Sequence, residues 1–394
     1  MEKAENCEMI KNAKIFMKNK EIDAWILYDF KNSNPLFWRV VGKKLPTSRR
    51  CFFFIPRTGQ PVIVANVLDK ELFSGSSWKV TVYSSREEME KKLSDLLDNW
   101  RTIAMEYSPR ANIPYVGRVD AGTVELFREK GIDVVSSGDL FQYSAARWSK
   151  QELEAHLEAA KKISAVKDEA FKFVRRRIAS HKLVTESDIQ RYILQKFAEK
   201  QLITEEKPIV AVNENTARPH YEPREKDCKR MTTNDLLMVD LWAKTQDEKG
   251  VFADITWMAY LGKEVPEQYT RIFDIVAEAR DRVVAFLEKR MEKDESCCGW
   301  ELDDVARGFI EKQGFGNCFF HRTGHGIGSS VHGDSMNLDN YESKDTRPAI
   351  PGIGFSVEPG IYLKNWGIRS EINVYVDKKK PIVTTSVQKA IVTI

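Results

Sequence analysis

The chain has 394 residues, of which 61 are basic and 58 acidic, giving a formal net charge of +3. This near balance predicts neither a nucleic-acid partner nor a membrane surface as a partner. No apolar run approaches the roughly 20 residues of a membrane span. The charged start, Met1-Glu2-Lys3, lacks the apolar core of a signal peptide. We therefore expect a soluble, cytoplasmic protein of two or three domains.

The six cysteines are scattered along the chain, and none forms a C-x-x-C pair. This spacing excludes zinc-finger and thioredoxin-like sites. In a cytoplasmic protein we expect all six to be reduced, including Cys7 and the adjacent Cys297 and Cys298.

The first 145 or so residues alternate between helical and strand patterns. Helices are predicted over residues 3–18, 87–97 and 121–130, strands over 24–28, 102–105 and 132–135, and a hairpin of 51–55 with 61–65. Such alternation predicts an α/β domain in which helices pack on a mixed sheet.

A capping box, Ser149 with Glu152, predicts the start of a long helix that ends near residue 178. We place the domain boundary just before it, giving domains of residues 1–147 and 148–394. Further helices are predicted from Thr185, over 267–291, and over 301–313 with Gly314 as the residue after the cap. Strands are predicted over 236–242, 251–260, 354–357 and 368–375, so the second half is predicted to be α+β.

Histidines are confined to the second domain, where His321, His325 and His332 lie in one short stretch and His220 lies upstream. A lone histidine is more often structural than functional. His325 differs because glycines flank it on both sides, and glycine lets a ligand or metal approach the backbone. His325 is therefore a candidate metal ligand.

Two pairs of acids interrupt apolar segments of the second domain. Asp240 and Asp254 lie in predicted strands joined by the polar residues 244–250, so a hairpin would bring them together. Glu358 and Glu371 repeat this arrangement around the turn-forming residues 364–367. A buried carboxylate requires a cation or hydrogen-bond donors.

Four carboxylates and one imidazole form a suitable ligand set for two divalent cations. Two such ions a few Å apart can share a bridging water, lower its pKa and polarise a carbonyl oxygen.

The ordered set of five residues resembles the metal ligands of the M24 metallopeptidase family, which has the pita-bread fold. They are Asp240, Asp254, His325, Glu358 and Glu371. The resemblance covers essentially the whole chain, and it implies a creatinase-type N-terminal α/β domain before an α+β pita-bread catalytic domain.

By this resemblance, Asp254 and Glu371 bridge both metals, and Asp240 binds one of them. His325 and Glu358 bind the other, and Glu358 is also the general base for a metal-bridged water that acts as nucleophile. The implied metals are two divalent ions, with manganese expected and cobalt, zinc or iron as alternatives. A peptide is the implied substrate, and a homodimer is the implied assembly.

Four further residues match functional positions of the proline-specific members. His332 matches a histidine that steadies the substrate carbonyl, and His220 matches one that contacts the substrate near the scissile bond. Arg369 matches an arginine that orients Glu371 or the substrate. His321, four residues before the ligand histidine, is typical of the proline-specific enzymes, although it can equally be a residue that only hydrogen-bonds the ligands.

The large N-terminal domain also favours the proline-specific enzymes over methionine aminopeptidases. We therefore expect a Xaa-Pro aminopeptidase, with a Xaa-Pro dipeptidase (prolidase) as the alternative. There are two other hypotheses: a metal-free hydrolase of creatinase type and a non-catalytic pita-bread binding protein. The intact ligand set argues against both.

Three departures from the family pattern concern substrate preference more than catalysis. Asp240 and Asp254 are 14 positions apart, which is wider than usual. Trp257 stands where an arginine is common, and residues 331–334 replace a common His-Glu pattern.

Overall fold

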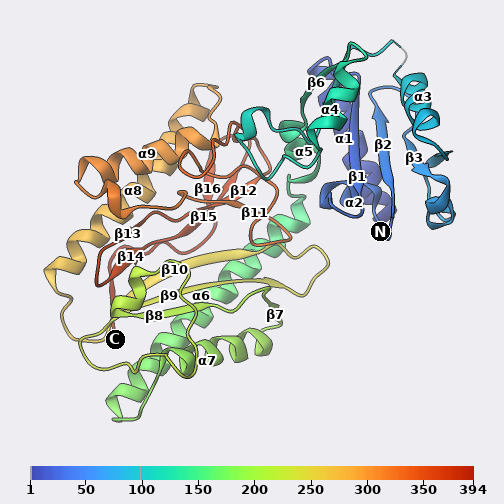
Figure 1. Ribbon diagram of the computed structural model, residues 1–394. Helices are drawn as coiled ribbons and strands as arrows, with labels where there is room; N and C mark the ends of the chain where they lie inside the picture. The colour runs from blue at the N-terminus through green and yellow to red at the C-terminus, as the bar shows by residue number, and fades with distance from the viewer. Residues whose placement is uncertain (1, 98) are drawn as a thin grey trace. The chain divides into compact units, whose positions relative to one another are not determined.

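The computed structural model describes residues 2–97 and 99–394, with side chains of the first helix described from Glu8 onward (Figure 1). The chain divides into two compact units, Met1–Ala145 and Ala146–Ile394, called here the N-terminal and C-terminal units. The helix predicted over residues 3–18 is confirmed as α1 (Glu2–Asn19). The predicted reduced state of Cys7 lies outside the described side chains.

The N-terminal unit is built on one mixed sheet of strand order β4-β3-β2-β1-β5-β6. Its strands are β1 (Ala24–Phe30), β2 (Arg50–Pro56), β3 (Val62–Asn66), β4 (Lys79–Tyr83), β5 (Thr102–Met105) and β6 (Asp133–Ser136). Its remaining α-helices are α2 (Pro35–Val41), α3 (Arg86–Leu96), α4 (Ala121–Arg128) and α5 (Gly138–Ala145).

Helices cover both faces of this sheet, as the alternating pattern predicted. Trp25 of β1 packs into a core with α1, α2 and α5, whereas the next residue, Ile26, packs into a second core with α3 and α4. The predicted hairpin of β2 and β3 is confirmed as an antiparallel pair.

Four helices frame the C-terminal unit: α6 (Lys150–Ala179), α7 (Glu186–Glu199), α8 (Glu267–Glu292) and α9 (Gly299–Lys312). The predicted capping box is confirmed, since the Ser149 hydroxyl accepts a hydrogen bond from the amide of Glu152 while the Glu152 carboxylate accepts one from the amide of Ser149. Thr185 and Asp188 cap α7 in the same way. Beyond α9, Gly314 has a φ of +86°, which suits the glycine predicted there. No described helix is both long and apolar enough to cross a bilayer.

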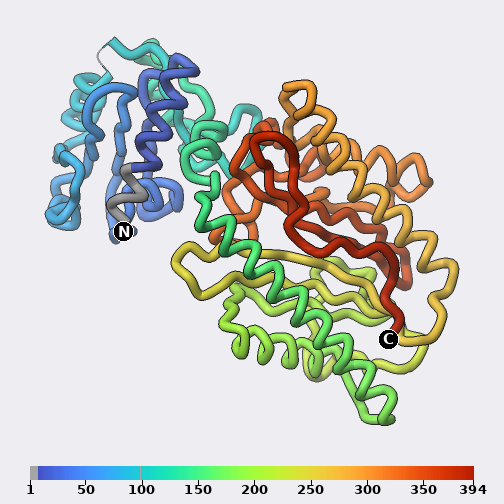
Figure 2. The backbone as a smooth tube through the Cα atoms, turned by 180° about the vertical axis from the view of Figure 1, so that it is seen from behind, coloured from blue at the N-terminus to red at the C-terminus, as the bar shows by residue number. Residues whose placement is uncertain are grey.

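The strands of this unit form three sheets. They are β7 (Leu202–Ile203), β8 (Ile209–Val212), β9 (Leu236–Thr245), β10 (Ala253–Tyr260) and β17 (Val392–Thr393) in one sheet, β11 (Gly326–Ile327), β12 (Gly354–Val357), β15 (Ile372–Val376) and β16 (Pro381–Val383) in another, and β13 (Gly360–Tyr362) with β14 (Gly367–Arg369) as a third. Helices α6 and α7 lie on one side of β8, β9 and β10, while β12 to β16 with α8 and α9 lie on the other (Figures 1 and 2).

The two faces of β9 therefore meet different partners. Val239 and Leu241 pack with α6 and α7, whereas Met238 packs with α8 and α9. Side chains alternate along a strand, so Asp240 points toward the second set of elements, into the interior between the two layers. The apolar run around Asp240 thus reflects a strand that is buried on both faces.

The acids Glu358 and Glu371 lie between two antiparallel strand pairs, β12 with β15 and β13 with β14. The paired residues nearest this break are Val357 with Ile372 and Gly360 with Arg369. Both pairs follow one antiparallel register, which places Glu358 opposite Glu371. The single strand predicted over residues 368–375 is therefore wrong, because β14 and β15 pair in different sheets and are separated by Ser370-Glu371.

Candidate metal centre

The β9–β10 hairpin brings the two aspartates to one face of the sheet. Asp240 is paired with Thr256, and Asp254 lies two residues from Thr256 along β10. Residues two apart in a strand share a face, so Asp240 and Asp254 are diagonal neighbours. Both are buried, with 7% and 4% of their surface exposed.

The two glutamates reach the same interior from the break described above. Glu371 is 2% exposed, and its Oε2 accepts a hydrogen bond from the Thr256 hydroxyl at 2.9 Å. Glu358 is the more accessible of the two, with 16% of its side chain exposed. Its Oε1 accepts a hydrogen bond from Ser356 at 3.2 Å.

His325 turns one ring nitrogen toward these acids. Its Nδ1 lies 3.0 Å from the carbonyl oxygen of Gly326. A carbonyl only accepts hydrogen bonds, so Nδ1 carries a hydrogen. The other nitrogen, Nε2, lies 3.6 Å from Asp254 Oδ2 and 3.4 Å from Glu358 Oε1. The ligand atoms of Asp254, His325 and Glu371 all lie within 4.8 Å of one another.

The glycines beside His325 are required by close packing. A Cβ on Gly324 would lie 2.0 Å from the backbone oxygen of Ser356, and a Cβ on Gly326 would lie 2.4 Å from Ser335 Oγ. These glycines let the His325 segment pack closely against neighbouring chain segments, and the predicted approach of a metal or ligand to the backbone stays a prediction.

The residues present fit a metal ion. Three buried carboxylate oxygens at this position lack a hydrogen-bond partner among the described residues: Asp240 Oδ1, Asp254 Oδ1 and Glu371 Oε1. Such atoms are rare in folded proteins and require an explanation. Divalent cations supply one, because hard carboxylate oxygens with one imidazole nitrogen form a common ligand set for first-row metals.

The electrostatics of the cluster also favour bound cations. Burial and the neighbouring acids Asp254 and Glu358 raise the pKa of Glu371 well above its ordinary value. Burial likewise raises the pKa of Asp240 to about 7, against the lowering effect of Arg369. Crowded carboxylates in a low-dielectric interior resist ionisation together. Positive charge placed among them would relieve this repulsion.

Glu358 and His325 behave differently. Burial opposes ionisation of Glu358, but the charges of His325 and Arg369 together lower its pKa. Burial opposes protonation of His325, but its interactions with Asp254 and Glu358 together raise its pKa. The two groups therefore stabilise each other's charged forms.

Arg369 links the acids to a tyrosine and a threonine that sequence reasoning missed. Its Nη2 donates to Asp240 Oδ2 at 2.5 Å, its Nη1 donates to the Tyr362 hydroxyl at 3.0 Å, and its Nε donates to Thr256 Oγ1 at 3.1 Å. The side chain is 3% exposed, so these bonds fix its position. Tyr362 follows Glu358 by four residues, and no sequence pattern marks it.

The structure brings His321 and His332 to the edge of the cluster. His321 Nδ1 donates to the carbonyl of Arg322 at 2.7 Å, and its Nε2 lies 2.9 Å from the Tyr362 hydroxyl. Burial lowers the pKa of His321 to about 4, so its neutral ring accepts the tyrosine hydrogen. The rings of His325 and His332 are 4.5 Å apart. Desolvation and the nearby His325 lower the pKa of His332, and the residue as a whole is exposed.

His220 is exposed on the segment between β8 and β9. The carbonyl of the preceding residue, Pro219, accepts a hydrogen bond from Arg369 Nη1 at 3.3 Å, which places His220 next to a residue bound to the acid cluster. All of the sequence-predicted site residues therefore belong to one neighbourhood of the C-terminal unit.

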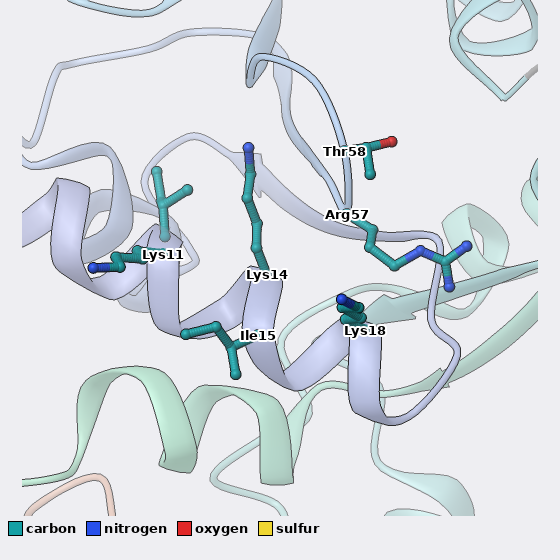
Figure 3. Close-up of a pocket in the computed structure, with 7 residues that line it drawn as sticks. Lys11, Lys14, Ile15, Lys18, Arg57 and Thr58 are labelled. Carbon is teal, nitrogen blue, oxygen red and sulfur yellow. The ribbon is translucent and has the colours of Figure 1, made fainter.

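A separate hollow of about 710 Å³ lies in the N-terminal unit (Figure 3). It is lined by Ile10, Lys11, Lys14, Ile15, Lys18, Arg57 and Thr58. This lining contains no acid and no histidine, so the hollow does not resemble the metal centre.

Comparisons with known proteins agree with the geometry. A model described as Metallopeptidase family M24 matches residues 154–378. The Xaa-Pro dipeptidase of Pyrococcus furiosus is 31% identical over 169 residues, which are 43% of this chain and 44% of that protein. A putative Xaa-Pro aminopeptidase of Mycoplasma genitalium is 28% identical over 176 residues, which are 44% of this chain and 46% of that protein. The matches thus span less than half the length of these curated relatives.

Solved structures match the fold over nearly the whole chain. The dipeptidase PepE from Mycobacterium ulcerans has a TM-score of 0.70 at 18% identity, covering 99% of this chain and 98% of that one. The X-Pro aminopeptidase from Thermotoga maritima has a TM-score of 0.62 at 21% identity, covering 98% and 99%. These similarities establish the fold alone, and they confirm the predicted α/β domain followed by a pita-bread domain. Because the family match covers more than half of the residues, this chain belongs to metallopeptidase family M24.

Proposed function

We propose that this protein is a metal-dependent peptidase that hydrolyses the peptide bond on the amino side of proline. The observation that carries the proposal is the buried cluster of acids with three unpartnered carboxylate oxygens beside His325. Such an arrangement is unstable without cations and suits their binding.

In the proposed site, Asp254 and Glu371 would hold both of two divalent cations, Asp240 would hold one, and His325 with Glu358 would hold the other. Cations bound there would supply a water molecule of lowered pKa and polarise the substrate carbonyl. Manganese is the proposed metal, with cobalt, zinc or iron as alternatives, because this mixed set of oxygen and nitrogen ligands accepts each of them.

Glu358 is the proposed general base, which accepts the proton of the attacking water and returns it to the leaving amine. Its lowered pKa keeps it ionised and able to accept a proton. Its 16% side-chain exposure also leaves a path to substrate that the more deeply buried Glu371 lacks.

Four further side chains are proposed to act around the substrate. His332, beside His325, would donate a hydrogen bond to the oxygen on which negative charge develops. His220 would contact the substrate near the scissile bond. Arg369 would orient the acids through its bonds to Asp240 and Thr256. His321 would shape the proline pocket through its contact with Tyr362.

Proline specificity is supported by the relatives rather than by the metal cluster. Matched proteins from Pyrococcus furiosus and Lactobacillus helveticus carry the name Xaa-Pro dipeptidase, and one from Mycoplasma genitalium carries the name putative Xaa-Pro aminopeptidase. We propose aminopeptidase action on longer peptides, with dipeptidase action as the second candidate that the dipeptidase names favour. The cytoplasmic location and the homodimer expected from the resemblance stay predictions, and light scattering of the purified protein tests the dimer.

The test compares three peptides, Ala-Pro, Ala-Pro-Ala and Ala-Ala-Ala, incubated with chelated protein before and after addition of manganese. We expect manganese-dependent cleavage of the proline peptides and little cleavage of Ala-Ala-Ala. Preference for Ala-Pro-Ala supports the aminopeptidase, and preference for Ala-Pro supports the dipeptidase. The matched variant Glu358→Gln, which keeps the four other proposed ligands, should lose most turnover.

Absence of cleavage with manganese, cobalt, zinc and iron would contradict the proposed activity. Full cleavage after complete metal removal would contradict the metal dependence and favour the metal-free creatinase-type reading. If the protein neither cleaves peptides nor binds metal, the reading as a non-catalytic binding protein gains support.

A further inference from the structure

Another buried carboxylate, outside the metal cluster, accepts hydrogen bonds from the chain segment that carries His220. Glu186, the first residue of α7, is wholly buried. Its carboxylate accepts hydrogen bonds from the backbone amides of Val212 and Lys229 at 2.8 Å each, from Asn215 Nδ2 at 2.9 Å and from the Tyr221 hydroxyl at 2.7 Å. All four donors belong to residues 212–229, a segment with little regular structure.

This arrangement specifies one conformation of the segment. A buried charge is tolerated only when hydrogen bonds replace its hydration, and hydrogen bonds to a charged acceptor are stronger than neutral ones. Each donor reaches Glu186 only if the backbone between 212 and 229 follows its observed path. The carboxylate therefore selects that path over the many others open to an irregular segment.

His220 lies between two anchored neighbours in this segment. Tyr221 donates its hydroxyl hydrogen to Glu186, and the carbonyl of Pro219 accepts from Arg369 Nη1 at 3.3 Å. A further tie joins the segment to β14, since the amide of Gly367 donates to Thr216 Oγ1 at 2.8 Å. One side of the segment is thus held by α7 and the other by elements that also hold the metal ligands.

We infer that Glu186 is a positioning residue that holds His220 in its observed place, between Tyr221 and the Pro219 carbonyl that Arg369 contacts. The inference rests on the proposed function, in which His220 contacts the substrate. Glu186 itself touches neither the acids of the cluster nor, in this account, the substrate. Its effect passes through Tyr221 and the backbone of the segment.

The test begins with Glu186→Gln, which keeps the size of the side chain but places an amide NH₂ group against donors. We expect kcat/KM for a proline peptide to fall by about 10- to 100-fold, because small misplacements of a substrate-contacting group lower rates on this scale. Metal content should stay unchanged. In the double variant with His220→Ala, the loss should be no greater than in His220→Ala alone, because the effect of Glu186 acts through His220.

The matched control is Glu152→Gln, which alters another glutamate at a helix start. Glu152 bonds the backbone of Ser149 in the capping box of α6, and its described hydrogen bonds involve no residue of 212–229. It should cost some stability and leave kcat/KM near the wild-type value. An equal loss of activity in both variants would show a general stability effect and overturn the inference.

A second readout needs no peptidase activity. In histidine-labelled protein, the ring resonance of His220, assigned by its loss in His220→Ala, should shift and broaden in Glu186→Gln, whereas that of the exposed His181 should not. If Glu186→Gln fails to fold, Tyr221→Phe removes one of the bonds and should produce a smaller change of the same kind. Unchanged His220 resonances, or multiplicative losses in the double variant, would refute the role of Glu186. A wild-type protein that cleaves no peptide would instead refute the proposed function, and the resonance would still test the positioning.

Discussion

Replacement of Glu371 by glutamine should have opposite effects on stability in the metal-free and metal-bound protein. Glu371 is 2% exposed, and its Oε1 has no hydrogen-bond partner among the described residues. Burial and the neighbouring acids Asp254, Glu358 and Asp240 raise its pKa well above the ordinary value, so ionisation of this carboxyl group is unfavourable in the metal-free protein. Glutamine cannot ionise, keeps the size and offers an NH₂ group to neighbouring carboxylates.

The magnitude follows from the burial. A buried polar group without a partner costs about 1–3 kcal/mol, so the metal-free variant should be more stable than the wild type by about 2 kcal/mol. For a unit the size of Ala146–Ile394, a change of this size raises Tm by about 4–8 °C. With metal at about 100 times its Kd, the wild type should gain about 2.7 kcal/mol. The variant should gain much less, because it has lost a ligand.

Differential scanning calorimetry of chelated and manganese-loaded samples measures both effects. The order of the two Tm values should reverse when metal is added. The exposed Glu248→Gln is a suitable control, since it removes a charge outside the cluster and should leave both Tm values unchanged. A lower Tm for chelated Glu371→Gln, or an equal gain with metal in both proteins, would show that Glu371 is not part of a repulsive metal site.

Four other predictions use single substitutions. Glu358→Ala should remove most turnover by deleting base and ligand together, and near-normal kcat would contradict its role. His325→Ala should lower metal content measured by plasma spectrometry, and unchanged content would refute its assignment as a ligand. His321→Ala, which removes the acceptor of the Tyr362 hydroxyl, should lower kcat/KM for proline peptides by about tenfold, and an unchanged rate would leave His321 a structural role. Burial raises the pKa of Glu106 from 4.5 to about 7. An acid whose pKa is higher in the folded state than in the unfolded state stabilises the folded protein at pH values below its unfolded-state pKa. This stabilisation is lost as the pH rises through the folded-state pKa. The wild type should therefore lose roughly 3 kcal/mol relative to Glu106→Gln across this window, and parallel denaturation profiles would contradict the assignment.

The elements of the fold were largely predictable because their signals are local. The capping boxes at Ser149 and Thr185 and the alternating segments of the N-terminal unit each depend on residues within a few positions of one another. The break between β14 and β15 was not predictable, because residues 368–375 have a continuous strand pattern. What separates the two strands is their pairing with different partners, which is a tertiary property.

The same limit applies to the candidate site. The five proposed ligands stand out because acids in apolar strands and a histidine between glycines are locally unusual. Thr256 and Tyr362 are ordinary residues for a strand, and their importance comes from contacts with Arg369, which is 113 positions from Thr256. Glu186 looks like a routine acid in the first turn of a helix, although it holds a segment up to 43 positions away. No local pattern encodes such contacts.

The alternation of side chains along β9 and β10 allows the sequence spacing of Asp240 and Asp254 to vary, but it does not allow their strand register to vary. The distance in sequence between Asp240 and Asp254 depends on the loop that joins the strands, and loop length is cheap to change. Their relation in space depends on strand register, where a shift of one residue exchanges the two faces. A single insertion between Asp240 and Thr245 would turn the aspartate toward α6, whereas several insertions in the following turn would leave it in place. The number of residues between two ligands is therefore a poor criterion for relating such hairpins to one another. The face of the sheet on which each ligand lies is a better criterion.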